Sequence, residues 1–433
     1  MPNESADKQS SPELKKSGLF SRLTLDVSLL KTNRNFRNLW LSSLITRFGS
    51  MITYVAVPYQ IKELTGSYIA VGLIAVFQVV PLIFFGLYGG SIADRYDRKK
   101  VVLWCELGFL SLVTALMVNS LSANPSIWII YVVGMLMSAL DGIQRPSLTA
   151  MTPRLVTREQ LPAASALDSI THNAGYLVGT SLGGLLVVSV GLSWSYLIDL
   201  ITYAISGIFL LLLPGIKPTS VLTTQHFSSI LEGASYAWNR KDLLGTYLID
   251  TAAMVFAFPN ALFPFLADYL DSPQALGLLY SSSAIGSIIA TSTSGWVKHV
   301  RRHGMAVVYA AALWGVGIAI VGLTDSLAIA LLGLIIAGGA DTISGLFRSL
   351  IWNTSIPDEL RGRLAGIELL SYSIGPHLGQ LRASFSANFF GLQRALISGG
   401  VLCTVSVLAL AQALPSLRNY LDLKENSAIS NQN

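Results

Sequence analysis

The stretch Gly90-Ser-Ile-Ala-Asp-Arg-Tyr-Asp-Arg-Lys-Lys100 lies between two long apolar segments of the chain. Only 12% of the 433 residues are charged, so a turn this rich in charge stands out from the rest of the sequence. Each flanking segment runs for about twenty residues, which is the length that a helix needs to cross the ~30 Å hydrocarbon core of a bilayer. We therefore interpret residues 90–100 as a short loop at one face of a membrane, and its basic residues indicate the cytoplasmic face.

The rest of the sequence repeats this pattern of apolar segments separated by short polar turns. Hydrophobic residues make up 52% of the chain, which exceeds what a soluble domain requires. A window of about twenty residues predicts an all-α polytopic membrane protein with twelve transmembrane helices. The predicted spans are residues 36–61, 69–92, 101–121, 127–151, 164–190, 194–213, 243–270, 276–297, 305–323, 327–351, 364–390 and 395–414.

The distribution of basic residues tests this arrangement. Twelve spans leave both termini on one side, and most of the Lys and Arg residues outside the spans fall on that same side. The opposite side has an acidic connection around Asp268 and Asp271. This asymmetry predicts a multi-pass protein of the plasma (cytoplasmic) membrane with both termini in the cytoplasm. Because the net charge of +5 comes from these loops, we expect no nucleic-acid partner.

A long connection at residues 214–242 divides the predicted spans into two groups of six. When the two groups are compared at a shift of 200 residues, Asp141 falls on Asp341. An acid that recurs inside the membrane at the same register predicts two six-helix bundles (a 6+6 pseudo-repeat) with a substrate site between them. The predicted regions are a cytoplasmic N-terminal tail (1–35), a first bundle (36–213), a cytoplasmic central loop (214–242), a second bundle (243–414) and a cytoplasmic C-terminal tail (415–433).

The charged turn resembles the loop signature of the major facilitator superfamily, which is roughly Gly-x-x-x-Asp-Arg-x-Gly-Arg-Arg between spans two and three. Asp97 stands where this signature usually has glycine, so the turn must be made differently here. Residues 36–40, 55–61 and 153–156 resemble the branch of enterobactin-type siderophore exporters and macrolide or multidrug efflux carriers. The residues that match the loop signature are Gly90, Asp94, Arg95, Arg98 and Lys99.

The resemblance implies that this turn is a cytoplasmic gate, in which Arg98 bridges the two halves in the outward-open state. The alternative is that the basic residues only hold the loop in the cytoplasm. Span five carries a glycine series that resembles the antiporter signature of the superfamily, with Thr180 in place of its proline. Small residues at this spacing equally predict a face for tight helix packing, without a role in antiport. The glycines of this series are Gly175, Gly179, Gly183 and Gly184.

Several charges fall inside the spans that, by the resemblance, line a central cavity. An ionised side chain at the bilayer centre costs roughly 2.5–3.5 kcal/mol on insertion scales, so each must face a cavity or a partner. Either they form structural ion pairs that never titrate, or at least one carboxylate takes up a proton during the transport cycle. The cavity charges, which include our proton-coupling candidates, are Arg47, Asp141, Arg145, Asp250, Asp341 and Arg348.

The acids of the spans outnumber these arginines, which favours a carboxylate that titrates. We expect the proton-carrying group among Asp250, Asp141 and Asp341. Asp168, Glu368 and the neighbouring His172 are secondary candidates, although a histidine that only supports helix packing is the simpler interpretation. Two other charged residues, Asp199 and Arg382, are predicted near the outer ends of spans six and eleven, at the membrane interface.

The sequence contains no Walker loop, no metal-ligand spacing and no nucleophile elbow, so we expect neither an enzyme nor a bound metal or cofactor. The first hypothesis is a secondary active exporter that acts as a monomer. It exchanges protons for an amphipathic organic compound, such as a drug, macrolide or siderophore, by alternating access. The alternative is a proton-coupled importer of a small solute on the same fold. Thr180 leaves this alternative open, because it replaces the proline of the antiporter signature. A non-transporting sensor or scaffold is a remote alternative, because no further soluble module is predicted.

Overall fold

The computed structural model describes residues 27–216, 235–236 and 238–421, without the side chains of Leu87 and residues 358–372. Throughout these ranges the regular structure is helical. The helices are α1 (Ser28–Thr32), α2 (Arg34–Thr65), α3 (Tyr68–Arg95), α4 (Arg98–Leu121), α5 (Ile127–Leu155), η2 (Arg158–Gln160), α6 (Leu161–Ser189), α7 (Leu192–Leu211), α9 (Lys241–Ala257), η3 (Asn260–Leu262), α10 (Phe263–Tyr269), η4 (Pro273–Ala275), α11 (Leu276–Ser292), η5 (Ser294–His299), α12 (His303–Leu323), α13 (Leu327–Ser355), α14 (Asp358–Phe390), α15 (Leu392–Ala413) and α16 (Pro415–Arg418).

The fold class predicted from the sequence is confirmed. Each predicted span corresponds to one long helix, except the seventh, which consists of α9, η3 and α10, and the eighth, which covers α11 and part of η5. In the described part of the chain, nine segments are long and apolar enough to cross a membrane. The remaining long helices, α2, α6 and α14, are more polar because they line a cavity or face the other half.

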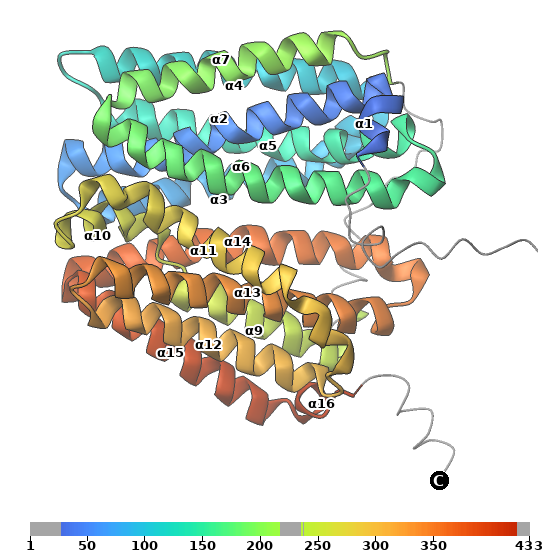
Figure 1. Ribbon diagram of the computed structural model, residues 1–433, viewed down its shortest axis with the longest axis vertical. Coiled ribbons are helices and arrows are strands. Elements are labelled where there is room, and N and C mark those ends of the chain that lie inside the picture. Colours follow the sequence, from blue (N-terminus) through green and yellow to red (C-terminus); the bar gives the residue numbers. More distant parts are fainter. Residues whose placement is uncertain (1–26, 217–234, 237, 422–433) are drawn as a thin grey trace, which may run out of the picture.

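The helices form two bundles that lie one above the other in Figure 1, α2–α7 in the first half and α9–α15 in the second. Within the first half α2 packs against α6 and α7, and α3 packs against α5. In the second half α9 packs against α14 and α15, and α11 packs against α13. The halves meet where α3 contacts α14 and where α6 contacts α11. The first and last described helices, α1 and α16, lie at the same end of the molecule.

The two halves repeat one another along the chain. Helices α5 and α13 begin and end 200 residues apart, as do the starts of α7 and α15. The glycines before α7 and α15, Gly191 (φ 94°) and Gly391 (φ 85°), share a positive φ that side chains with a Cβ rarely adopt. The repeat therefore extends to the turns, and it places Asp141 and Asp341 at equivalent positions of α5 and α13.

The seventh span is broken at Pro259, and Arg382 stabilises the break. Proline has no backbone N–H, so the carbonyl of Val255 loses the donor that an unbroken helix would supply. The guanidinium of Arg382 donates to the carbonyl oxygens of Val255 (3.4 Å), Phe256 and Ala395 (3.2 Å). The partly buried side chain of Arg382 thus does not extend to a surface but binds backbone groups inside the second half.

We expect Arg382→Met to destabilise the protein, because the carbonyl groups of Val255 and Phe256 lose this donor. An unpaired buried polar group costs about 1–3 kcal/mol, which a thermal unfolding experiment on the purified protein in detergent would resolve. The matched control is Arg394→Met at an exposed position of α15, where a change within about 0.5 kcal/mol is expected. Equal losses of stability in the two variants would contradict this role of Arg382.

Asp199 also differs from its prediction. Its side chain is fully buried in α7, where it accepts hydrogen bonds from Thr53 of α2 and from Thr202 (3.2 Å). Gly49 of α2 allows this contact, because a Cβ at that position would overlap the side chains of Thr202 and Asp199. Asp199 therefore joins two helices of the first half, and its side chain does not extend to a surface.

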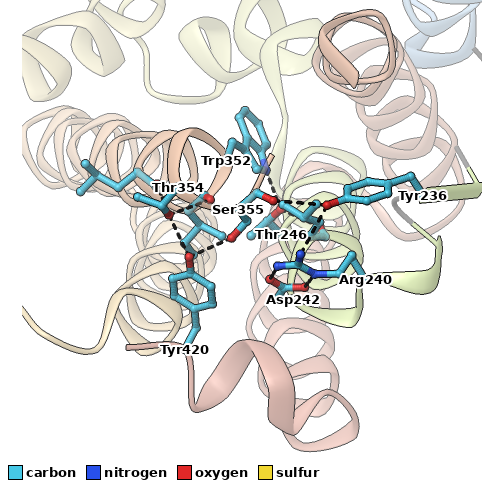
Figure 2. Close-up of polar contacts among 11 residues, drawn as sticks. Tyr236, Arg240, Asp242, Thr246, Trp352, Thr354, Ser355 and Tyr420 are labelled. Carbon is cyan, nitrogen blue, oxygen red and sulfur yellow. Dashed lines mark hydrogen bonds and ion pairs between the residues drawn. The ribbon is translucent and has the colours of Figure 1, made fainter. Parts of the chain in front are cut away.

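The last residues of α13 lie at the same end of the molecule as the 90–100 turn. Residues that precede α9 and residues that follow α16 form hydrogen bonds with them. Figure 2 shows Tyr420, which follows α16, hydrogen-bonded to the hydroxyls of Thr354 and Ser355 at 2.8 Å each. Tyr236, which precedes α9, donates to the backbone carbonyl of Ser355 at 3.4 Å. Trp352 donates to Thr246 of α9 at 2.8 Å. These contacts tie α9, α13 and the last described residues together, so the second half is one packed unit at this end.

Candidate functional site

A cavity of about 640 Å³ lies mainly inside the first half. Residues from each of the helices α2 to α7 line it, and Gln380 of α14 adds a side chain from the second half. Its size falls within the range of small-molecule binding sites. Phe36, Trp40 and Leu161 line it at the end that holds the 90–100 turn, so it extends toward that end. The charged residues of its lining are Arg47, Glu106, Asp141, Arg145 and Asp168.

A second cavity, of about 310 Å³, lies between α9, η3, α11 and α13 of the second half. Asp341 and Asn260 contribute polar groups to it. Tyr54 of α2 and His172 of α6 line both cavities. Polar space therefore extends from one half to the other through these two side chains.

In the first half, Asp141 and Arg145 form an ion pair on successive turns of α5, with 2.9 Å between Oδ2 and Nε. Both side chains are more than one third exposed. Arg47 lies close enough to this pair to interact electrostatically with both charges. Among the side chains that the structure describes, no acid lies within ion-pairing distance of Arg47, whose aliphatic part packs against Gly175. This wall of the cavity therefore presents two guanidinium groups and one carboxylate in close proximity.

In the second half, Arg348 of α13 forms an ion pair with Asp250 of α9, and both side chains are buried. Asp341 lies 3.9 Å from the same guanidinium and is 37% exposed where it lines the second cavity. Spacing along α13 suggests Asp341 as the partner of Arg348, but Asp250 is the closer one. Of the two acids near Arg348, Asp341 is therefore the one that lines the second cavity.

The Asp97 that departs from the loop signature is the N-cap of α4. Its Oδ1 accepts hydrogen bonds from the backbone N–H groups of Lys99 (3.0 Å) and Ile216 (3.2 Å). The N–H of Arg98 in turn donates to the carbonyl of Ile216 at 3.1 Å. An aspartate accepts hydrogen bonds at an N-cap that a glycine cannot accept, so the turn is stabilised by side-chain contacts.

The basic residues of the turn bind backbone carbonyls of the first half. The buried side chain of Arg98 donates to Ala93 (3.3 Å) and Ala150 (3.4 Å), and lies 3.9 Å from Asp94. Lys99 donates to the carbonyls at the end of α7. Arg95 is exposed, and a Cβ at Gly90 would meet nothing within 4 Å. In this conformation, the contacts described for Arg98 all lie within the first half, so its role as a bridge stays a prediction.

The glycines of α6 make close helix contacts. Gly175, Gly179 and Gly183 face α2, where a Cβ at each would overlap atoms of that helix. Gly184 faces Gly277 of α11, so this contact joins the two halves. Thr180 donates to the carbonyl of Tyr176 (2.7 Å) and leaves the helix unbroken at the position of the signature's proline. These contacts support the packing interpretation of the series.

The secondary candidates for proton coupling lie on two helices, α6 and α14. Asp168 and His172 both line the first cavity, and His172 lies near Arg47 and Arg145. Glu368 belongs to α14, but its side chain lies outside the described part of the structure.

Sequence reasoning missed one cavity residue, Glu106 of α4. Its side chain is 5% exposed, it belongs to the lining of the first cavity, and Gln144 of α5 donates to its Oε1 at 3.0 Å. The family resemblance places other spans around the cavity and does not include the third span, which is α4. The signal was present, because Glu106 lies inside an apolar segment with no basic residue three or four positions away.

The cavities are closed at the end opposite the 90–100 turn, where Figure 1 shows α10 and the start of α11 against the first half. Asn260 donates to the hydroxyl of Tyr54 at 3.0 Å. Tyr68 packs on Phe265 with 4.2 Å between ring centroids. Further contacts across the halves are the ion pair of Lys62 with Asp268 and the approach of Gly184 to Gly277. Aromatic, polar and charged contacts therefore join the halves on this side.

Two repeated six-helix halves that contain charged cavities define a membrane protein of the transporter class. The sequence matches the Major Facilitator Superfamily over residues 39–379. The chain belongs to this superfamily of transporters.

Its curated relatives include the enterobactin exporter EntS of Escherichia coli (strain K12), which is 30% identical over 403 residues. That alignment covers 92% of this chain and 95% of the relative. The enterobactin exporter EntS of Shigella boydii serotype 18 shows the same identity and coverage.

Solved structures with the same fold include a point mutant of the nucleoside transporter NupG, with a TM-score of 0.74 at 13% identity. That match covers 87% of this chain and 99% of NupG. A bacterial homologue of the iron transporter ferroportin, in an inward-facing state, matches with a TM-score of 0.68 at 16% identity. It covers 87% of this chain and 98% of the homologue. At such low identity, these matches establish the fold alone.

Proposed function

We propose that this protein is a secondary active exporter of the cytoplasmic membrane that exchanges protons for an amphipathic organic compound by alternating access. The observation that carries the proposal is Asp341, a carboxylate exposed to a cavity beside an arginine that already pairs with Asp250. A carboxylate in this position can gain and lose a proton without breaking the buried ion pair. The relatives named as enterobactin exporters support export as the direction.

The membrane orientation follows from the basic residues. The 90–100 turn and the other basic loops face the cytoplasm, so the end at which Tyr68 meets Phe265 faces outward. The first cavity then extends toward the cytoplasm and is closed toward the outside. This conformation would receive a compound from the cytoplasm, as an exporter requires. In the opposite conformation, the gate formed by the 90–100 turn would close the cytoplasmic end.

The cavity lining supports an aromatic compound that carries negative charge. Trp40, Tyr54 and Phe109 provide aromatic surface, and Arg47 and Arg145 provide guanidinium groups that bind carboxylates or phenolates. A catecholate siderophore such as enterobactin combines both features and is the first substrate to test. Macrolides and aromatic cations are the other compounds to test.

The exporter proposal is tested in inside-out membrane vesicles with an acidic lumen. We expect one of three compounds, enterobactin, a macrolide or an aromatic cation, to accumulate in the lumen while the luminal pH rises. Asp341→Asn should lower this proton-driven accumulation about tenfold at a pH difference of one unit, and Ser386→Ala in α14 provides a control outside both cavity linings. Luminal pH that does not respond to any of the compounds would contradict proton exchange. Proton-driven uptake found only in right-side-out vesicles would favour the importer.

A further inference from the structure

Glu106 lies in the wall of the first cavity but plays no part in the ion pairs described above. Gln144 donates a hydrogen bond to Oε1 at 3.0 Å. The hydroxyls of Thr46 and Ser206 lie near the carboxyl group, yet Oε2 is buried and meets neither at hydrogen-bond geometry. Helices α2, α4, α5 and α7 thus surround one carboxyl group that has contact with the cavity.

The groups that face Glu106 do not neutralise a negative charge. From α7, Asp199 adds a second buried acid, and Tyr203 is a buried phenol. From α5 come the neutral Gln144 and, one turn away, the already paired Asp141 and Arg145. In the described part of the chain, no basic side chain lies within ion-pairing distance of Glu106. An unpaired carboxylate is unfavourable in a buried, membrane-embedded site, so this environment favours the protonated acid.

Glu106 and Asp199 differ in their position relative to the first cavity. Asp199 accepts hydrogen bonds from Thr53 and Thr202 and does not itself line the cavity, so a compound in the cavity does not contact it directly. Glu106 lines the cavity, and its partner Gln144 is three residues from Asp141 on the same helix. A compound that binds at the Asp141–Arg145 pair would therefore disturb the hydrogen bond that holds Glu106. The 200-residue repeat puts Ala306 at the corresponding position, so the second half has no such acid.

We propose that Glu106 is a proton-binding site of the transport cycle. The inference rests on the proposed proton exchange and deepens it by assigning a site in the first half. The carboxylate binds a proton when the cavity is open to the outside and holds it as a carboxylic acid in the conformation described here. When a compound occupies the cavity, the O–H bond of the acid breaks and the proton passes to cytoplasmic water.

The proton on Glu106 can be detected directly by infrared titration of the purified protein in detergent. We expect wild-type protein near neutral pH to show the C=O stretching band of a protonated carboxyl group that is absent in Glu106→Gln. Asp199→Asn is the matched control, because it removes a buried acid of the same region and should leave the Glu106 band in place. Identical carboxyl bands in the wild type and Glu106→Gln would overturn the proposal.

Transport by reconstituted protein tests whether this proton is exchanged, with enterobactin as the probe. If Asp341 and Glu106 each exchange one proton per substrate, a pH difference of one unit supports about a hundredfold concentration ratio. We expect Glu106→Gln to lower this ratio about tenfold while exchange of labelled for unlabelled enterobactin continues, and Glu106→Asp to retain the wild-type ratio. A ratio in Glu106→Gln equal to that of the wild type would overturn the proposal. A wild type that does not respond to a pH gradient would instead contradict the proposed antiport.

Discussion

Gly184→Ala is expected to prevent the halves from closing at the end opposite the 90–100 turn. The backbones of α6 and α11 touch at Gly184 and Gly277, and a Cβ on Gly184 would overlap the backbone nitrogen of Gly277. Backbone atoms cannot rotate away as a flexible side chain can, so the helices must separate. Overpacking of this kind costs about 1–3 kcal/mol, enough to reduce the closed population and transport by roughly tenfold or more.

The closed state can be measured with a cysteine pair. Tyr68 and Phe265 lie in opposite halves with ring centroids 4.2 Å apart, so Tyr68→Cys with Phe265→Cys should form a disulfide under mild oxidation. We expect Gly184→Ala to lower the yield of this disulfide. The matched control is Gly207→Ala in α7, because a Cβ there would meet nothing within 4 Å. A disulfide yield in Gly184→Ala equal to that of the control would contradict the account.

Arg348→Met is expected to cause the largest loss of stability among single substitutions in the second half. Arg348 and Asp250 pair with side chains only 9% and 5% exposed, so removing the cation leaves a buried carboxylate without compensation. Breaking a buried pair in this way costs about 3–5 kcal/mol, whereas replacing both partners is often far less damaging. Thermal unfolding and yield of the purified protein measure the loss.

The second substitution provides the internal control. The double variant Arg348→Met with Asp250→Asn should recover most of the stability that the single variant loses, because no buried charge remains unpaired. The comparison pair in the first half, Asp141 and Arg145, is more exposed, so Arg145→Met should cost no more than about 1 kcal/mol. A double variant no more stable than Arg348→Met alone would show that the ion pair does not determine this effect.

The fold could be predicted from the sequence because its signals are local and repeated. Apolar segments of membrane-spanning length define the helices, and the 200-residue shift that relates Asp141 to Asp341 also relates the bounds of α5 and α13. Gly191 and Gly391 extend the repeat to the turns, where a positive φ requires glycine. Each of these features depends on residues close together in the chain or on a constant shift between the halves.

Contacts between helices could not be predicted in the same way. The partner of Arg348 is Asp250, nearly one hundred residues away, although Asp341 is closer in sequence. Arg382 looks interfacial by its position in the chain, yet the carbonyls exposed by Pro259 bind it inside the bundle. Glu106 was missed because the cavity was assigned by span number. Such pairings depend on helix rotation and on breaks, which hydropathy does not encode.

Proton exchange against substrate is tested most directly by the direction in which protons move. Proteoliposomes of known protein orientation would be prepared with equal pH on both sides, and a gradient of enterobactin would be imposed across the membrane. We expect protons to move opposite to enterobactin, and fewer protons to move per enterobactin in Asp341→Asn. Proton movement in the same direction as enterobactin, or enterobactin transport without any proton movement, would contradict the account.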